Sequence, residues 1–298
     1  MLKLMTRKPS LKLAGLTAAA WLSVGAQSSL AADATKSADT SKSDQVPSDT
    51  IDVSGKAIVP DALYGSYRQP VWTTRRVFPT TRSYVIPAGN LTTELWIKAH
   101  KYRDGTPNDY LIQEEIEYGL PGRIQLDLYI NQKNEVRDGK RLTDHEGEQY
   151  ELRWAMADWG VLPLNPTWYF EYHARKNNPA KGEVRLLLSE TLAPNLHASA
   201  NLAYEQELWG VAKERELAVT AALGTTAFVS TLSIGAEVKS EWVDTSKNRG
   251  HFHPELVVGP SLQWRPTPAT HIDLAPLFGV QKDAPQIETW LIVGHNLR

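Results

Sequence analysis

The amino-acid sequence predicts an all-β protein, an antiparallel transmembrane β-barrel of about twelve strands that follows a disordered periplasmic segment. Three observations predict it: an export signal at the N-terminus, a period-two alternation of apolar and polar residues from Leu91 onward, and alternating short and long connections. A period of two is typical of strands whose two faces meet different environments. In an outer-membrane barrel these environments are lipid outside and a polar lumen inside.

Composition excludes several classes of function. The chain has 298 residues and no cysteine, which excludes disulfides, thiol nucleophiles and thiolate metal sites. Its formal net charge of -2 offers no basic surplus for a nucleic-acid partner. After the export signal, no stretch approaches the roughly 18 consecutive apolar residues of a helical membrane span.

Residues 1–31 are expected to be a secretory signal peptide. Basic residues lie between Lys3 and Lys12, Leu13–Ala26 is an apolar stretch, and Ser29–Ala31 supplies small residues before a cleavage site. The apolar stretch is too short for a membrane-anchoring helix, so we favour cleavage.

Residues 32–85 are expected to form a flexible periplasmic segment. Residues 32–56 are rich in Ser, Thr, Asp and Lys and cannot bury enough surface to offset their chain entropy. Aromatic residues such as Trp72 and Phe78 then occur among arginines and prolines. For this second part we favour an irregular lead-in to the first strand over a segment packed at the barrel mouth or an inserted plug.

Residues 86–298 are expected to form the barrel. The alternation is clearest in Arg123–Gln132, and most predicted strands have about nine to eleven residues, which suits a tilted crossing of a bilayer. The predicted strands are Leu91–Lys101, Tyr110–Tyr118, Arg123–Gln132, Gln149–Ala157, Thr167–Arg175, Glu183–Leu192, Leu196–Gln206, Glu214–Leu223, Phe228–Trp242, Glu255–Arg265, Thr270–Val280 and Gln286–Leu297.

The connections between these strands alternate in length. Short turns are predicted at Leu120–Gly122, Ala193–Asn195, Gly224–Thr226 and Pro266–Pro268. Longer polar loops are predicted at Lys133–Glu148, Lys176–Gly182, Glu207–Lys213 and Asp244–Gly250. Short periplasmic turns and longer outer loops are typical of outer-membrane barrels, and a periplasmic N-terminus places every short turn on the periplasmic side.

The apolar face is expected to meet lipid. A soluble barrel would place the same residues inside, but the export signal, the strand length and the loop asymmetry favour a membrane. Two aromatic belts support this choice, with Trp154, Trp168, Phe228 and Trp264 near one end and Tyr102, Tyr172, Tyr204 and Trp242 near the other. Glu114 interrupts the lipid face, and Pro260 and Pro276 lie inside strands, so we expect bulges or register shifts there.

The opposite face is strongly polar and acid-rich, and it is expected to line the lumen. Buried charges must be hydrated or paired, so the lumen is either a polar pore with a mild cation preference or a cross-strand ion-pair network that plugs the barrel. The candidate constriction consists of Glu117, Asp127, Arg153, Glu171 and Arg185 on successive strands. The same five residues are equally compatible with a salt-bridged layer that binds no ligand.

Other chemistry is weakly supported. His251 and His253 would project to the same side of a strand, but without a third ligand we interpret them as exposed loop histidines and expect no metal. No nucleophile elbow, phosphate-binding loop or His-Glu-x-x-His motif occurs, so we expect neither a cofactor nor an enzyme.

Several motifs carry a resemblance to a known family. They are Tyr118–Arg123, Asn165–Tyr172, Gly259–Pro268, Ala275–Val280, Asp283–Pro285 and Ile292–Gly294. Together they resemble outer-membrane barrels grouped with the MetA-pathway phenol-degradation (transporter-like) proteins, over the region from Pro87 to Arg298. The resemblance implies a barrel fold and a link to the uptake of aromatic compounds, and it implies no site residues.

These observations predict an outer-membrane barrel that passively transports small solutes, aromatic or cationic. The first alternative is a plugged structural barrel that binds a partner through its outer loops or its N-terminal segment. The second is a lipid-modifying enzyme at the rim. The expected partners are outer-membrane lipid, a small-molecule solute and the barrel-assembly machinery during biogenesis.

Overall fold

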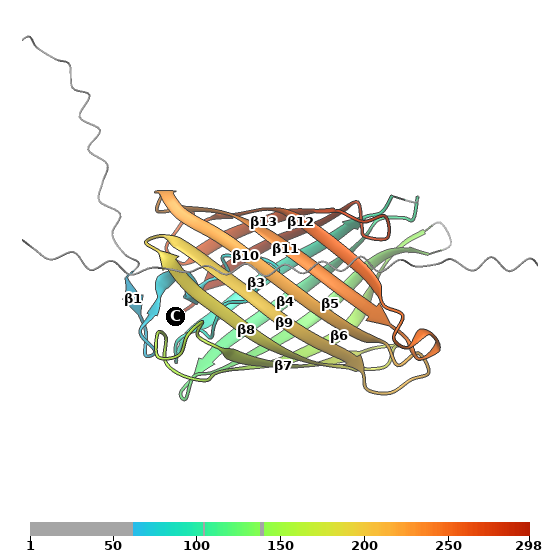
Figure 1. Ribbon diagram of the computed structural model, residues 1–298, viewed down its shortest axis with the longest axis horizontal. Helices are drawn as coiled ribbons and strands as arrows, with labels where there is room; N and C mark the ends of the chain where they lie inside the picture. The colour runs from blue at the N-terminus through green and yellow to red at the C-terminus, as the bar shows by residue number, and fades with distance from the viewer. Residues whose placement is uncertain (1–61, 104, 138–139) are drawn as a thin grey trace, which may run out of the picture. The chain divides into compact units, whose positions relative to one another are not determined.

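The computed structural model describes residues 62–103, 105–137 and 140–298, apart from the side chains of residues 137, 227 and 228 (Figure 1). The predicted signal peptide, residues 1–31, lies outside the described residues. From residue 91 onward the chain forms a closed barrel of twelve antiparallel strands, which confirms the predicted fold class. No helix among the described residues is long and apolar enough to cross a membrane.

Each barrel strand pairs with the next along the chain, and the last pairs with the first. The strands are β3 Leu91–Lys101, β4 Asp109–Leu120, β5 Ile124–Arg137, β6 Lys140–Ala155, β7 Thr167–Arg175, β8 Lys181–Ala193, β9 Leu196–Glu207, β10 Arg215–Val229, β11 Leu232–Asp244, β12 His253–Trp264, β13 Thr270–Gly279 and β14 Ile287–Asn296. The barrel closes where β14 pairs with β3, from Ile287 opposite Lys101 to Asn296 opposite Thr92. Twelve predicted strands therefore correspond to twelve observed ones.

Two predicted connections are wrong. The predicted turn Gly224–Thr226 belongs to β10, which continues to Val229. The predicted loop Lys133–Glu148 is largely strand, because β5 and β6 extend toward each other and remain paired as far as Arg137 and Lys140. The other short turns lie where predicted, at the end of the barrel that also carries the start of β3 and the C-terminus. We call this the turn end and the opposite end the loop end.

The apolar face of the strands points outward. In β5, Leu126, Leu128 and Ile130 are 41%, 53% and 49% exposed, whereas Asp127 and Tyr129 between them are 1% and 4% exposed. An apolar exterior around a polar interior excludes the soluble-barrel alternative, in which the same residues would face inward. Trp154 and Trp264 lie exposed near the turn end, and Tyr172 and Tyr204 lie exposed near the loop end, as two aromatic belts require.

The lipid-facing interpretation makes a testable prediction about stability. Replacing Leu128 in the middle of the apolar band by arginine (L128R) should lower the free energy of unfolding by about 2–4 kcal/mol, because a charge at the bilayer midplane is costly. The same change at Leu192, which is exposed at the turn-end tip of β8, should cost about 1 kcal/mol or less. Urea titration in lipid vesicles measures both, and equal losses would contradict the placement of the band.

The expected irregularities are partly present. Glu114 is exposed on the outer face, but β4 keeps a continuous register with both neighbours, so the expected bulge is absent there. Between β12 and β13 the pairing is interrupted at residues 259–261 opposite 275–277, the positions of Pro260 and Pro276. A proline has no N–H for the ladder, so the interruption follows from the sequence.

The segment before the barrel requires a correction. The sequence predicts a flexible periplasmic segment at residues 32–85, but residues 67–87, which we call the plug, are almost entirely buried. The plug contains β2 Gln69–Pro70, which pairs with β1 Leu63–Tyr64 in a short hairpin, and then the 3₁₀ turn η1 Val71–Thr74. Residues 32–61 of the expected segment lie outside the described residues.

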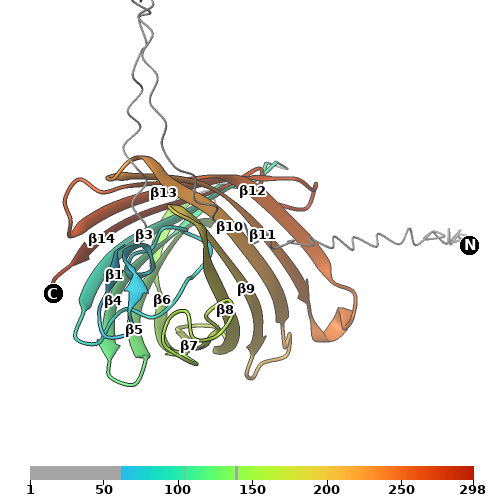
Figure 2. The ribbon, with the colours of Figure 1, turned by 60° about the vertical axis from the view of Figure 1, so that its left-hand side comes forward.

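The plug lies inside the barrel, as its hydrogen bonds and ion pairs show. They reach strands on all sides of the lumen: β3, β4, β5, β6, β8, β9, β11 and β12. Only a segment within the ring can contact so many strands, and Figure 2 shows its ribbon there. The inserted plug, one of the alternatives to an irregular lead-in, is therefore the arrangement present in the structure.

Both ends of the plug lie at the turn end. The Tyr67 hydroxyl donates to the carbonyl of Leu120 (2.6 Å), and the N–H of Gly89, just after the plug, donates to the carbonyl of Gly119 (2.8 Å). Between these points the chain runs inward until the Thr80 N–H donates to Glu237 Oε2 (2.9 Å), near the middle of β11. The plug is thus a loop that enters and leaves the lumen through the same opening.

Candidate functional site

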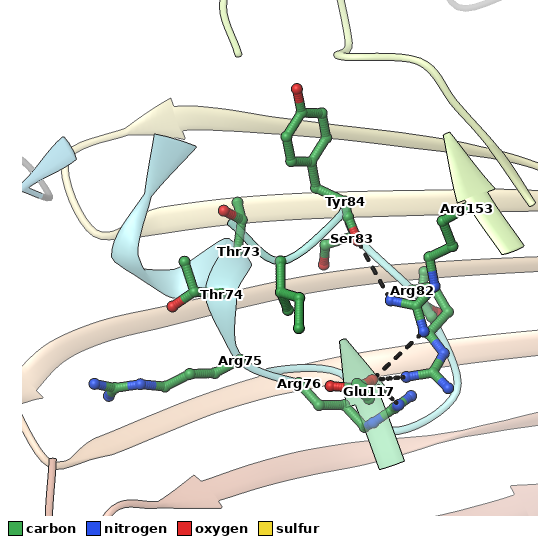
Figure 3. Close-up of a pocket in the computed structure, with 11 residues that line it drawn as sticks. Thr73, Thr74, Arg75, Arg76, Arg82, Ser83, Tyr84, Glu117 and Arg153 are labelled. Carbon is green, nitrogen blue, oxygen red and sulfur yellow. Dashed lines mark hydrogen bonds and ion pairs between the residues drawn. The ribbon is translucent and has the colours of Figure 1, made fainter. Parts of the chain in front are cut away.

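A buried cluster of charged side chains joins the plug to the barrel wall. Inward positions of β3 to β6 alternate with lipid-facing ones and place their carboxylates in one region of the lumen. We define the ion-pair cluster as Arg76 and Arg82 of the plug with Glu94, Glu115, Glu117, Asp127, Glu151 and Arg153 of the wall. All eight are buried. In Figure 3, Arg76, Arg82 and Arg153 gather around Glu117.

Arg76 is held by three carboxylates and an aromatic ring. Its Nε lies 2.7 Å from Glu94 Oε2, and its Nη2 lies 3.3 Å from Glu115 and 3.4 Å from Glu117. Its guanidinium carbon lies 3.8 Å from the centre of the Trp96 ring, in a cation–π arrangement. The Arg76 carbonyl accepts a hydrogen bond from Gln263, so both the backbone and the side chain are fixed.

Arg82 spans the wall from β4 to β6. It lies 3.1 Å from Glu115, 3.4 Å from Glu117 and 3.7 Å from Glu151, and it donates to the Tyr129 hydroxyl (2.5 Å). Burial lowers the pKa of Arg82, but these acidic groups outweigh it and raise the pKa well above its ordinary value. The guanidinium is therefore charged in its buried position.

Without the plug arginines, the wall part of the ion-pair cluster has an excess of carboxylates. It has five carboxylates and one arginine, Arg153, which lies 2.8 Å from Asp127 and 3.6 Å from Glu117 and also pairs with Glu151. The plug adds two further guanidinium groups. Because unpaired buried charges are expensive, the plug arginines compensate a wall that Arg153 alone leaves strongly negative.

The structure divides the five predicted constriction residues into two groups. Glu117, Asp127 and Arg153 belong to the ion-pair cluster. Glu171 and Arg185 lie on the other side of Tyr169, whose ring centre is 6.0 Å from the guanidinium carbon of Arg153 and 4.6 Å from that of Arg185. Glu171 accepts from the Tyr169 hydroxyl and from Gln149 (2.7 Å), and Arg185 pairs with Glu183.

Sequence reasoning missed the residues that come from the plug. Arg76 and Arg82 make six of the nine ion pairs within the cluster. The only signal for them was a concentration of arginine and aromatic residues before the first strand. Trp96 was missed as well, although its inward position follows from the alternation in β3. A tryptophan on an otherwise polar face was the available signal for a binding surface.

A cavity lies against the inner tip of the plug. It has a volume of about 180 Å³, and we call it the vestibule. Four aromatic rings and five charged groups are in its lining: Trp96, Tyr129, Tyr169 and Trp290, with Arg76, Arg82, Lys98, Arg185 and Glu171. Lys98, Leu111 and Trp290 in this lining are partly exposed, so solvent reaches the vestibule.

Within the plug itself there is little free space. The cavity shown in Figure 3, bounded by Thr73, Ser83, Glu117 and Arg153 among others, has a volume of about 20 Å³. A volume of roughly 10–15 Å³ holds one water molecule. The plug therefore closes this part of the lumen to anything larger than water.

The carboxylates also form two groups with metal-ligand spacing. Glu94, Glu115 and Glu117 form one, and Glu115, Asp127 and Glu151 form the other, with ligand atoms within 4.8 Å of one another. In this arrangement the plug arginines and Arg153 form ion pairs with these carboxylates. His251 and His253 are both exposed at the loop end; His251 lies in the loop, whereas His253 is the first residue of β12.

Comparison with known proteins agrees with the fold. No family model matches the chain, and no curated protein matches it either. An outer-membrane channel from Pseudomonas putida F1 matches at 9% identity with a TM-score of 0.53, over 72% of this chain and 97% of that one. The NanC porin matches at 12% identity with a TM-score of 0.47, over 68% of this chain and 97% of that one.

The first of these matches shows a shared fold. The resemblance to MetA-pathway phenol-degradation proteins is not confirmed at the level of that family and stays a prediction. The closed barrel and its apolar exterior require a membrane around it, and barrels of this kind lie in outer membranes. The chain has the fold of an outer-membrane β-barrel and lies in the outer membrane.

Proposed function

We propose that the chain is an outer-membrane channel for small solutes whose lumen is closed by a displaceable plug. The observation that carries this proposal is the asymmetry of the lumen, with a solvated vestibule of about 180 Å³ on one side of the plug and a cavity of about 20 Å³ within it. A barrel that served only as a scaffold would have no need of a hydrated, ring-lined cavity. The turn end is the periplasmic end in this proposal.

The plug is held in a way that suits displacement. Between η1 and β3 it contains no strand or helix, and side chains make most of its contacts with the wall. Its residues Trp72, Phe78 and Tyr84 are buried, but it is not hydrogen-bonded into the sheet as a further strand. Displacement therefore leaves the barrel ladder intact.

The solute preference follows from the vestibule. Its four aromatic rings support the expected preference for aromatic solutes. The vestibule does not support the predicted preference for cations, since four of its five charged side chains are basic. The wall carboxylates favour cations only when the plug is displaced from the lumen.

The first alternative, a plugged structural barrel, is favoured by the closure of the lumen, and electrical measurement separates it from a channel. The full chain in planar bilayers should remain closed for most of the time and show discrete openings as voltage is raised. The folded state is checked by the different migration of boiled and unboiled samples on detergent gels. A folded barrel that never conducts at any voltage would support the structural alternative. The expectation that the chain is not an enzyme, and its contact with the assembly machinery, stay predictions.

A further inference from the structure

The vestibule is the right size for one aromatic ring. Its volume is about 180 Å³, and a cavity of about 150 Å³ in another protein binds benzene. Trp96 and Trp290 form an edge-to-face pair with ring centres 5.8 Å apart, on the neighbouring strands β3 and β14. The hydroxyls of Tyr129 and Tyr169 donate to Glu151 and Glu171, so these two residues offer the cavity ring surface rather than a free hydroxyl.

The charges around the vestibule favour an anion. Among the described residues that line it, Glu171 is the only one with a carboxylate, and it already accepts hydrogen bonds from two neutral donors, Gln149 and Tyr169. A cationic ligand would join four basic side chains there and would have no uncommitted carboxylate to pair with. An anionic ligand meets the opposite situation.

Two of the basic groups have donors to spare. Lys98 Nζ lies 3.8 Å from Glu288, its nearest carboxylate partner, and that carboxylate is already engaged by Lys239 (2.9 Å) and His100 (3.2 Å). Arg76 Nη1 is buried and has no hydrogen-bond partner among the described residues. Buried donors normally have a partner, so Arg76, which lines both the vestibule and the smaller cavity within the plug, has a donor to which no acceptor is assigned.

These two donors flank the tryptophan pair. The Arg76 guanidinium lies over Trp96 at 3.8 Å, and Lys98 Nζ lies 4.7 Å from the centre of the Trp290 ring. A ligand whose ring lies against Trp96 and Trp290 therefore brings a substituent on that ring close to both positive groups. The acceptor that suits two such donors is a carboxylate.

We propose that the vestibule binds a single-ring aromatic carboxylate, with its ring against Trp96 and Trp290 and its carboxylate toward Lys98 and Arg76. This inference rests on the proposed function, because it makes the vestibule the solute site of the channel. It keeps the aromatic solute predicted from the sequence and replaces the predicted cation by an anion. The wall carboxylates of the ion-pair cluster are paired with arginines, and the charged groups that line the vestibule are mostly basic.

Benzoate is the probe, and its binding to the full chain in detergent can be followed by quenching of tryptophan fluorescence and by calorimetry. Benzoate should bind saturably and at least about tenfold more tightly than benzylamine, which has the same ring and the opposite charge, or acetate, which has the charge alone. Benzylamine binding as tightly as benzoate, or no saturable benzoate binding, would overturn the proposal.

A matched pair of lysine variants localises the site. Lys98→Met keeps the apolar stem and should weaken benzoate binding about tenfold. Lys101→Met, at the exposed loop-end residue of the same strand, should leave it unchanged. Equal effects of the two variants would place the benzoate elsewhere. Binding is measured without conduction, so a barrel that binds benzoate but never conducts refutes only the channel, and one that conducts without binding refutes only this site.

Discussion

Replacing both plug arginines by alanine (R76A/R82A) should convert a mostly closed barrel into a mostly open one. The two guanidinium groups make six ion pairs with the wall at 2.7–3.7 Å. Removing one partner of a buried ion pair typically costs about 3–5 kcal/mol. A loss on the order of 3 kcal/mol in plug binding is enough to change its closed-to-open ratio more than a hundredfold.

Single-channel recording in planar bilayers measures this change. The opened variant should also select cations, because five wall carboxylates then face the lumen and their basic neighbours on the wall are Arg153 and His271, which lies 3.4 Å from Glu94. The reversal potential in a salt gradient reports that preference. Arg75→Ala is the matched control, since Arg75 is next in sequence but, within the described part of the chain, its side chain bonds to the Pro268 carbonyl alone (3.0 Å), at the turn end. If R76A/R82A stays as closed as R75A, the plug is not held by its charges.

A covalent link between plug and wall should hold the channel closed even without these charges. Ser83 Oγ of the plug lies 3.2 Å from Ser199 Oγ of β9, and the chain has no cysteine of its own. Cysteines at both positions are close enough for a disulfide. Introduced into R76A/R82A, S83C/S199C should restore the closed state under oxidising conditions and release it on reduction.

The control uses the same wall residue. Ser189 and Ser199 face each other across β8 and β9, with their oxygens 2.9 Å apart, so S189C/S199C links the wall to itself and leaves the plug free. In the same background this control should conduct whether oxidised or reduced. A barrel in which oxidised S83C/S199C conducts as freely as the control would show that current passes the plug without displacing it.

The barrel was predictable because its determinants are local. A strand with lipid on one side and a polar lumen on the other must alternate, and the alternation of β5 from Ile124 to Ile130 is visible without any knowledge of the fold. The orientation of the strands followed from that alternation together with the connections. The grouping of Glu117, Asp127 and Arg153 followed too, because they occupy inward positions on successive strands; their role as a constriction stays a prediction.

The plug was not predictable in the same way, because its partners are remote in sequence and come from many strands. Arg76 meets Glu94, 18 residues away, and its carbonyl meets Gln263, 187 residues away. No periodicity within residues 67–87 encodes such contacts. The irregular backbone therefore gave no signal beyond composition, which is ambiguous between a lead-in and an insert.

The wrong turn at Gly224 has the same cause. A β-carbon at Gly224 would lie 2.7 Å from the Phe78 ring of the plug, and one at Gly119 would lie 2.1 Å from the Pro87 carbonyl oxygen. Both glycines lie within strands and make room for the plug. Glycine in a strand often marks such a close approach, but sequence alone cannot distinguish it from a turn.

The shared entrance and exit of the plug has a mechanical consequence. Because both ends of the plug lie at the turn end, the plug can leave the lumen through that opening. Its exit requires neither breaking the pairing of β14 with β3 nor passing a chain end through the barrel. Gly89, with a φ of +87°, and its bond to Gly119 fix the downstream end where β3 begins. A pulling force on the chain before Tyr67 would draw the plug out of the lumen while Gly89 stays attached to the wall. When the force stops, the plug could return to the lumen.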